Sequence, residues 1–205
     1  MLTRARIAVL VSGGGTNLEA LLRSQEGGSL SHGEIVLVCS SQPGAYALTR
    51  AANHGVPRAV VARSGKSQEA FEAELQEQLT RCQADLIVLA GFMSILSADF
   101  VRRWPDRIVN VHPSLIPSFC GKGYYGLHVH EAALEYGVKV SGATVHFVNE
   151  IPDGGRIILQ KAVAVRSGDT PEILQKRIME QAEWKILPRA AEKVAAMIAS
   201  GKLPE

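Results

Sequence analysis

The chain has 205 residues, of which 46% are hydrophobic and 20% charged, and 22 basic against 20 acidic residues leave a formal net charge of +2. This length and apolar content suit one medium-sized domain with a buried core, so we expect residues 1–205 to form a single domain. Neither a dense Lys/Arg cluster nor a run of about 18 apolar residues occurs, which excludes nucleic acid and the membrane as expected partners.

The first half of the chain alternates strand-like and helix-like segments. Short apolar runs bounded by turn residues predict strands at residues 7–12, 34–39, 58–61, 85–90 and 108–112. The segments between them predict helices at residues 17–23, 44–54, 68–82 and 98–103. Such alternation indicates right-handed βαβ units and therefore an α/β fold with a doubly wound, mostly parallel, Rossmann-like sheet.

The second half of the chain has a different pattern. Residues 143–149 and 156–165 have no helix between them, only a short loop with one proline and two glycines, which predicts an antiparallel strand pair. Residues 170–200 predict one long C-terminal amphipathic helix, with Thr170 as its cap and Pro171 in its first turn. We expect Pro188 to interrupt this helix.

A glycine-rich loop, Ser12-Gly13-Gly14-Gly15-Thr16-Asn17, follows the first predicted strand and opens the first helix. Backbone N–H groups in such a loop can turn toward an anion, and the helix N-terminus adds a positive dipole end. The third glycine of a dinucleotide fingerprint is replaced by Leu18, and no Asp or Glu ends the second strand. The loop therefore predicts a site for a phosphate monoester; the alternative is a tight turn without a ligand.

Three polar residues suggest acyl-transfer chemistry. Asn110 and His112 lie on the same side of the strand at residues 108–112, and His112 ends it, where open α/β sheets place their ligands. Asp153 stands in the loop between the last two strands. An amide can donate to an oxyanion, an imidazole can move a proton, and a carboxylate can orient that imidazole. Taken singly, His112 could be a packing residue and Asp153 a turn former.

Five motifs together resemble the folate-dependent phosphoribosylglycinamide formyltransferases of purine synthesis, over nearly the whole chain. They are Val11-Ser12-Gly13-Gly14-Gly15-Thr16-Asn17-Leu18, Leu89-Ala90-Gly91-Phe92-Met93, Asn110-Val111-His112-Pro113-Ser114-Leu115, Gly142-Ala143-Thr144-Val145-His146-Phe147-Val148 and Asp153-Gly154-Gly155. The segment from His112 to Leu115 alone also marks other formyltransferases and formyltetrahydrofolate hydrolases. The resemblance implies glycinamide ribonucleotide and 10-formyltetrahydrofolate as small-molecule substrates, no metal, and a monomer or homodimer.

The resemblance also implies roles for individual residues. The catalytic trio would be Asn110, His112 and Asp153, supported by His146. The nucleotide would be bound at its phosphate, along its path and at its ribose by Gly14, Gly15, Thr16, Asn17, Gly91, Met93, Pro113 and Glu183. The folate would be bound by Leu89, Phe92, Ser94, Ile95, Leu96, Val101, Asn110, Asn149 and Asp153. Protonated His112 would stabilise the formyl oxygen, with its pKa raised by Asp153.

The chain departs from the family pattern at three places. Ser94 stands where many members carry an arginine that helps to hold the folate. Glu180, one turn before Glu183, replaces a familiar Lys or Gln and either accepts from a ribose hydroxyl or faces solvent. The loop at residues 117–126 is longer than in the shorter members, which predicts either a mobile lid with Lys122 near the phosphate or a surface insertion.

Other functional readings of the sequence are less well supported. Cys39, Cys82 and Cys120 form no CxxC pair, which favours a reducing cytoplasm; Cys120 lacks the partner that a nucleophile needs. No leader is predicted before the first strand. His128 and His130 could bind a metal with His112 and Asp153, and Trp104 and Trp184 are expected to be packing residues. The rival functions are formyltetrahydrofolate hydrolysis, formyl transfer to another amine, and nucleotide binding without catalysis.

Overall fold

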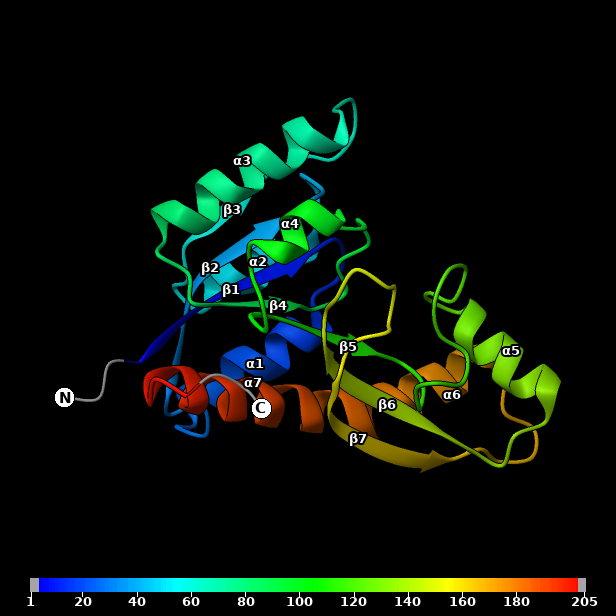
Figure 1. Cartoon of the computed structure of the whole chain (residues 1–205). Coiled ribbons are helices and arrows are strands. Elements are labelled where there is room, and N and C mark those ends of the chain that lie inside the picture. The colour runs from blue at the N-terminus through cyan, green and yellow to red at the C-terminus, as the bar shows by residue number, and fades with distance from the viewer. Residues whose placement is uncertain (1–3, 203–205) are drawn as a thin grey trace.

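A computed structural model describes residues 4–202, and its centre is a seven-stranded sheet in the order β3-β2-β1-β4-β5-β6-β7 (Figure 1). Residues 1–3, on which the expectation of no leader partly rests, lie outside the described part. The strands are Ala5–Val11 (β1), Gly33–Ser40 (β2), Arg58–Val60 (β3), Leu86–Leu89 (β4), Ile108–His112 (β5), Val140–Phe147 (β6) and Ile157–Ala164 (β7). The helices are Thr16–Glu26 (α1), Tyr46–Asn53 (α2), Gln68–Arg81 (α3), Ala98–Arg102 (α4), His128–Tyr136 (α5), Pro171–Ile178 (α6) and Trp184–Ala199 (α7), with a π-helical segment, Met179–Glu183 (η1), before α7.

The pairing of the strands confirms the predicted fold class. Strands β1 to β5 pair in parallel, whereas β6 pairs antiparallel with β5 and β7 antiparallel with β6. The strand order reverses between β1 and β4. These two strands are parallel neighbours, so their carboxyl ends lie side by side. Ligands of open α/β sheets bind at such a switch point, beyond the carboxyl ends of the strands.

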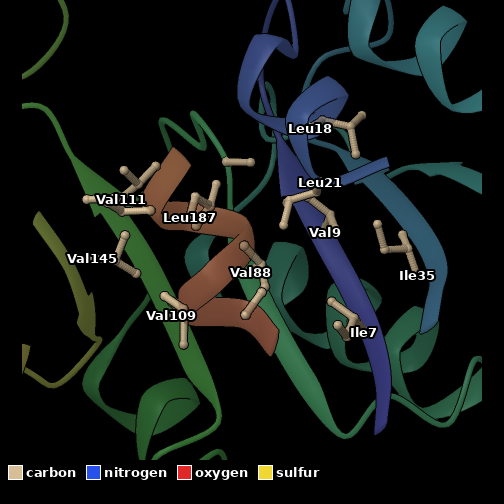
Figure 2. Packing of buried hydrophobic residues seen from close by; sticks show 14 of the residues in the cluster. Ile7, Val9, Leu18, Leu21, Ile35, Val88, Val109, Val111, Val145 and Leu187 are labelled. Carbon is tan, nitrogen blue, oxygen red and sulfur yellow. The ribbon is translucent and has the colours of Figure 1, made fainter. Parts of the chain in front are cut away.

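Helices cover both faces of the sheet, which explains the continuous apolar runs of its strands. On one face, Ile7, Val9 and Val11 of β1 pack with α1, α2, α6 and α7; on the other, Ala8 and Leu10 pack with α3 and α4. Figure 1 shows α3 and α4 above the sheet and α1 and α7 below it. Figure 2 shows side chains of the first of these clusters, contributed by strands, by α1 and by α7. The period of two along each strand thus separates two cores.

The C-terminal helical region differs from its prediction. Thr170 caps α6 as expected, since its hydroxyl accepts a hydrogen bond from the backbone N–H of Ile173 at 3.4 Å. The predicted interruption at Pro188 is wrong, because α7 continues through this residue. The irregularity lies upstream, in η1, where one wide π turn ends at the residue before Trp184. The ring of a proline inside a helix clashes with the carbonyl group four residues earlier, which here is that of Trp184. The wide π turn of η1 ends next to Trp184, where it can relieve this clash.

Between residues 4 and 202, no helix combines the length and the apolar character that a membrane crossing requires.

Candidate active site

The catalytic trio predicted from the sequence meets at the carboxyl end of β5. Asn110 and His112 project from the same side of this strand, and the antiparallel register places His146 of β6 opposite Asn110. The β6–β7 loop then returns Asp153 to the same place: its carboxylate oxygens lie 3.5 Å from His112 Nδ1 and 3.6 Å from His146 Nε2. Residues about forty positions apart are therefore neighbours, as expected.

His146 fixes the orientation of Asn110. Its Nδ1 donates to the carbonyl oxygen of Phe147 at 2.8 Å, so in the neutral imidazole Nε2 carries the lone pair. This Nε2 lies 3.2 Å from Asn110 Nδ2, which donates to it. His146 is buried within the sheet, so the amide of Asn110 is held by a rigid neighbour, and the structure is consistent with the supporting position expected for His146.

The backbone around Asp153 leaves no room for a Cβ atom at either of the two positions that follow it. A Cβ on Gly155 would stand 1.7 Å from the carbonyl oxygen of Phe147, and one on Gly154 would stand 2.8 Å from Cβ of Ile151. Asp153 itself has a φ of 55°, a left-handed conformation that Asp tolerates better than most residues. The Asp-Gly-Gly sequence therefore lets the loop run against the end of β6 and aim the carboxylate at His112.

Electrostatics keep the carboxylate charged and the neighbouring imidazole neutral. Burial raises the pKa of Asp153, but the adjacent imidazoles of His146 and His112 and the N–H of Gly121 together lower it by more, so the net pKa is lowered. The net pKa of His112 is also lowered, because the cost of burying its charged form outweighs the attraction of Asp153. The expected rise in the His112 pKa is therefore wrong, although Asp153 does act in that direction.

The long loop at residues 117–126 contacts this cluster through its backbone. The carbonyl oxygen of Phe119 accepts from His112 Nε2 at 2.8 Å, and the N–H of Gly121 donates to Asp153 Oδ2 at 2.9 Å. Phe119 has a φ of 50°, and its ring makes edge contacts with Tyr124 and Tyr136. The loop therefore lies against the side chains of both His112 and Asp153, while Lys122 is exposed.

An open pocket of about 790 Å³ adjoins the carboxylate of Asp153. It lies between residues 116–121 of the long loop and residues 151–157 of the β6–β7 loop. Cys120 is part of its wall, and burial followed by the charge of Asp153 raises the pKa of this thiol. A thiol that resists ionisation is a poor nucleophile, which argues against covalent catalysis by Cys120.

The glycine loop lies at the switch point between β1 and β4. Gly15 has a φ of 73°, and a Cβ on it would stand 2.7 Å from Cβ of Ala47, so this position requires glycine. Added Cβ atoms on Gly13 and Gly14 would meet nothing within 4 Å, which leaves that side of the loop open. Gly15 is also the N-cap of α1, and no side chain within the described residues caps the first N–H groups of this helix. These groups are free to bind an anion.

Glu183 reaches the glycine loop from the π-helical segment. Its carboxylate accepts from Asn17 Nδ2 at 2.6 Å, and its side chain is buried. Burial raises the pKa of Glu183, opposed by this hydrogen bond. Thr16 Oγ1 lies 3.9 Å from Sδ of Met179 in the same segment. The residues predicted to hold phosphate and ribose are therefore adjacent, although they are far apart in the sequence.

The residues predicted to flank the folate lie at the end of β4, where Leu89 pairs with Asn110, and in the segment that follows this strand. Leu89 and Val101 are buried, Phe92 and Leu96 pack against the same core cluster, and Ile95 is 76% exposed. Glu72 of α3 holds this segment, since its carboxylate accepts from the backbone N–H and the hydroxyl of Ser97, both at 2.6 Å. The segment thus offers an apolar strip on an anchored loop. Met93 at its start is exposed, and its N–H donates to the Ser12 hydroxyl.

The two histidines of α5 point to opposite environments. His128 is exposed and pairs with Glu131 at 2.9 Å. His130 is fully buried, neither of its ring nitrogens has a hydrogen-bond partner among residues 4–202, and its pKa is lowered to about 4 by burial and by the charge of His112. The side chains of residues 4–202 include no group of three His, Cys, Asp or Glu arranged to hold a metal ion.

His130 is expected to make stability depend on pH. Its folded pKa of about 4 lies below the ordinary 6.5, so the unfolded chain binds the extra proton and the free energy of unfolding falls as the pH is lowered through this window. Replacement by Leu should remove a contribution on the order of 3 kcal/mol to this fall. Urea unfolding at several pH values measures it, with the exposed His128→Leu as control. Parallel curves for wild type and His130→Leu would contradict the assignment.

Comparison with known proteins places the chain in a family. The family model described as formyl transferase matches residues 5–191. The chain belongs to the formyl transferase family. The resemblance drawn from the motifs is therefore confirmed at the level of the family.

Relatives of this formyl transferase chain carry related names. The chloroplastic phosphoribosylglycinamide formyltransferase of Arabidopsis thaliana is 39% identical over 87% of this chain and 61% of that protein. The trifunctional purine biosynthetic protein adenosine-3 of Drosophila melanogaster is 45% identical over 97% of this chain but only 14% of its own length, so the chain spans about one seventh of that relative. The crystal structure of glycinamide ribonucleotide transformylase 1 from Symbiobacterium toebii has a TM-score of 0.87 and 42% identity, over 97% of this chain and 89% of that one.

Two departures of this formyl transferase from the expected pattern can be located. Ser94 is half-buried in the segment after β4, next to the exposed Ile95. Glu180 is exposed, with a carboxylate oxygen 4.0 Å from Nζ of Lys176, so it faces solvent while Glu183 faces Asn17. Trp104 donates to Gln76 at 3.0 Å and packs beside α4, whereas the buried Nε1 of Trp184 has no hydrogen-bond partner in the described part of the chain.

Proposed function

We propose that this protein transfers the formyl group of 10-formyltetrahydrofolate to the amine of glycinamide ribonucleotide in purine synthesis. The observation that carries the proposal is the convergence of an ionised Asp153 with His112 and Asn110, beside a glycine loop that can hold a phosphate. The names of the relatives support the same reaction. Because the curated relatives extend well beyond this chain, the proposal concerns only the reaction of this chain.

The proposed reaction is a direct transfer. The amine nitrogen of the nucleotide attacks the formyl carbon, the new C–N bond forms, and the formyl oxygen becomes negatively charged in a tetrahedral intermediate. Collapse of this intermediate breaks the bond to N10 of the folate. Asn110 Nδ2 donates to the oxyanion, a contribution of about 3–4 kcal/mol for one well-placed donor.

His112 is suited to donate to the same oxygen. Its lowered pKa leaves the imidazole neutral before substrates bind, and Nε2 then carries the proton that now faces the Phe119 carbonyl. Exchange of that carbonyl for the formyl oxygen would bring Nε2–H to the oxyanion. As negative charge develops, Asp153 favours protonation of His112, so the pair responds to the transition state more than to the substrate.

Asp153 also serves the proton transfer. The attacking amine must lose a proton and N10 must gain one, and a water held by an ionised carboxylate can relay it between them. The carboxylate is ionised in the free protein because its pKa is lowered. Asp153 therefore acts as the acceptor that the relay needs.

The substrates would occupy the two sides of the trio. The 5′-phosphate would bind the N–H groups of Gly14, Gly15, Thr16 and Asn17, and Glu183 would accept from the ribose hydroxyls, with Gly91, Met93 and Pro113 along the nucleotide. The pterin would lie against the apolar strip formed by Leu89, Phe92, Ile95, Leu96 and Val101, near Ser94, with Asn110 and the backbone from Asn149 to Asp153 at its polar edge. We further propose a cytoplasmic protein acting as a monomer or homodimer.

A direct assay tests the proposed function. Purified protein is mixed with 10-formyltetrahydrofolate, and tetrahydrofolate release is followed by absorbance with and without glycinamide ribonucleotide. Release that requires the nucleotide, together with formation of formylglycinamide ribonucleotide, is the expected result. Release at the same rate without the nucleotide would identify a hydrolase, and nucleotide binding without any release would identify a binding module.

Lys122 tests whether the long loop takes part in nucleotide binding. The backbone of this loop touches His112 and Asp153, and Lys122 is exposed on it. If the loop closes over the nucleotide, Lys122→Ala should raise the KM for glycinamide ribonucleotide by about threefold to tenfold, the loss of one solvent-exposed charge contact, with kcat unchanged. Steady-state kinetics give both constants, and Lys139→Ala, an exposed lysine outside the loop, is the control. An unchanged KM would remove the lid role.

A further inference from the structure

The glycine loop is held from behind by α2. The backbone N–H of Ala47 donates to the carbonyl oxygen of Gly13 at 3.1 Å, and Nε of Arg50 donates to the carbonyl oxygen of Gly14 at 2.9 Å. Two successive carbonyl groups of the loop therefore point toward the same helix. Arg50 is the side chain that holds the second of them.

The direction of these carbonyl groups decides where the loop amides point. In a planar trans peptide the C=O and the following N–H point in opposite directions. With the Gly13 and Gly14 carbonyls turned toward α2, the N–H groups of Gly14 and Gly15 face away from it. Successive N–H groups on one side of a chain form an anion-binding concavity.

Close packing prevents the loop from retreating toward α2. A Cβ on Gly15 would stand 2.7 Å from Cβ of Ala47 and 3.4 Å from Cδ of Arg50, so the loop already touches this helix. The opposite side is open at Gly13 and Gly14. The loop is therefore supported on the α2 side and accessible on the other.

Arg50 connects the loop to the first turn of α1. Its Nη1 donates to Glu19 Oε2 at 3.0 Å, and its guanidinium lies 5.1 Å from the centre of the Tyr46 ring. Its planar fork thus joins a loop carbonyl and a helix carboxylate in one fixed geometry, which a lysine cannot reproduce. Glu19 keeps further partners in Arg23 at 2.8 Å and His54 at 3.5 Å.

We propose that Arg50 is a positioning residue for the phosphate of the nucleotide substrate: by holding the Gly14 carbonyl it aims the N–H groups of the glycine loop at the phosphate. The proposal rests on the proposed function, since it concerns the same nucleotide. Arg50 acts through the loop, not through the reacting atoms. Its effect should therefore depend on whether the substrate carries a phosphate.

The test compares two substrates in four proteins: wild type, Arg50→Met, Arg50→Lys and Arg23→Ala. Arg50→Met keeps an unbranched apolar stem over Tyr46 but removes both hydrogen bonds, and Arg23→Ala removes another partner of Glu19 without touching the loop. With glycinamide ribonucleotide, we expect Arg50→Met to raise KM by about tenfold or more, with kcat and the KM for formyl folate within about twofold of wild type. With the dephosphorylated riboside, wild type and Arg50→Met should have equal kcat/KM. Arg23→Ala should match wild type on both substrates, and Arg50→Lys should recover part of the loss.

Other outcomes would overturn the proposal. An equal loss of kcat/KM on both substrates would assign Arg50 a purely structural role, and an unchanged KM for the phosphorylated substrate would show that the loop does not need it. A loss of the same size in Arg23→Ala would trace the effect to the charge of Glu19. Binding of ribose 5-phosphate, measured by calorimetry, separates this proposal from the proposed function. Arg50→Met should bind ribose 5-phosphate at least about tenfold more weakly than wild type, and this difference should hold even if no formyl transfer is observed. Equal dissociation constants for the two proteins would overturn the proposal.

Discussion

Replacement of Asp153 by Asn is expected to lower kcat by at least about a hundredfold. The carboxylate lies within 3.6 Å of both His112 and His146, and its pKa is lowered, so it is ionised in the free protein. Asn preserves the size of the side chain and tolerates the φ of 55° observed at this position. In the proposed mechanism the carboxylate holds the relay water and favours protonation of His112 in the transition state, and the substitution removes the charge that does both.

The measurement is single-turnover formyl transfer at saturating substrates, so that binding does not enter the comparison. Asp106→Asn is a matched control, because Asp106 also has a left-handed φ, of 53°, but stands on the surface away from the trio. The control should retain wild-type turnover. An Asp153→Asn variant with near-wild-type turnover and an intact fold would exclude Asp153 from the proton transfer.

Much of the fold could be predicted from the sequence because local and global signals agree. The central parallel strands β1, β2, β4 and β5 are buried on both faces and appear as apolar runs, and helical segments of ordinary length separate most of them. Thr170-Pro171 marks the start of α6 by cap chemistry. The course of the C-terminal helix was less predictable. A proline normally ends or kinks a helix, but here a π-helical segment just upstream accommodates it, and such segments have no strong sequence signature.

The side-chain part of the candidate site was also predictable, because its residues end strands or sit in a glycine-rich turn. The backbone groups that contact these side chains could not be predicted. The Phe119 carbonyl on His112 and the Gly121 N–H on Asp153 depend on how an irregular loop folds back, and any residue type supplies a carbonyl or an N–H. The lowered pKa of His112 was missed for a similar reason: the charge of Asp153 is visible in the sequence, whereas the extent of burial is not.

Arg50 was missed because it belongs to no motif of chemistry-bearing residues, and His130 was considered only as a metal ligand beside His128. Arg50 is a charged residue of the short helix α2, and the sequence alone predicts that it faces solvent. Its proposed role depends on how closely that helix approaches the glycine loop. His130 follows the exposed His128 by two positions on α5. Residues two positions apart lie on different sides of a helix, so His128 faces solvent and His130 faces the interior. Histidines of α5 that seemed alike in the sequence thus differ in burial, charge and expected effect.

Substitution of Gly155 by Ala is expected to reduce activity about a hundredfold without changing any side chain of the trio. The added Cβ would stand 1.7 Å from the Phe147 carbonyl oxygen and 2.7 Å from its carbon, so the backbone must move. Phe147 ends β6, and its N–H is already bonded to the Arg156 carbonyl at 2.9 Å, which leaves the β6–β7 loop to shift. A displacement of about 1 Å at a reacting group costs on the order of a hundredfold in rate.

The same collision should also destabilise the fold, by about 1–3 kcal/mol, the usual cost of forcing extra atoms into a packed region. Thermal unfolding and formyl transfer are measured together, with Gly44→Ala as control, because an added Cβ at Gly44 meets nothing within 4 Å. That control should keep both stability and rate. If Gly155→Ala unfolded at a lower temperature yet transferred formyl groups at the wild-type rate, the close approach of the loop to β6 would support folding alone. The position of Asp153 would then have to be fixed by its hydrogen bond from Gly121 and its contacts with His112 and His146.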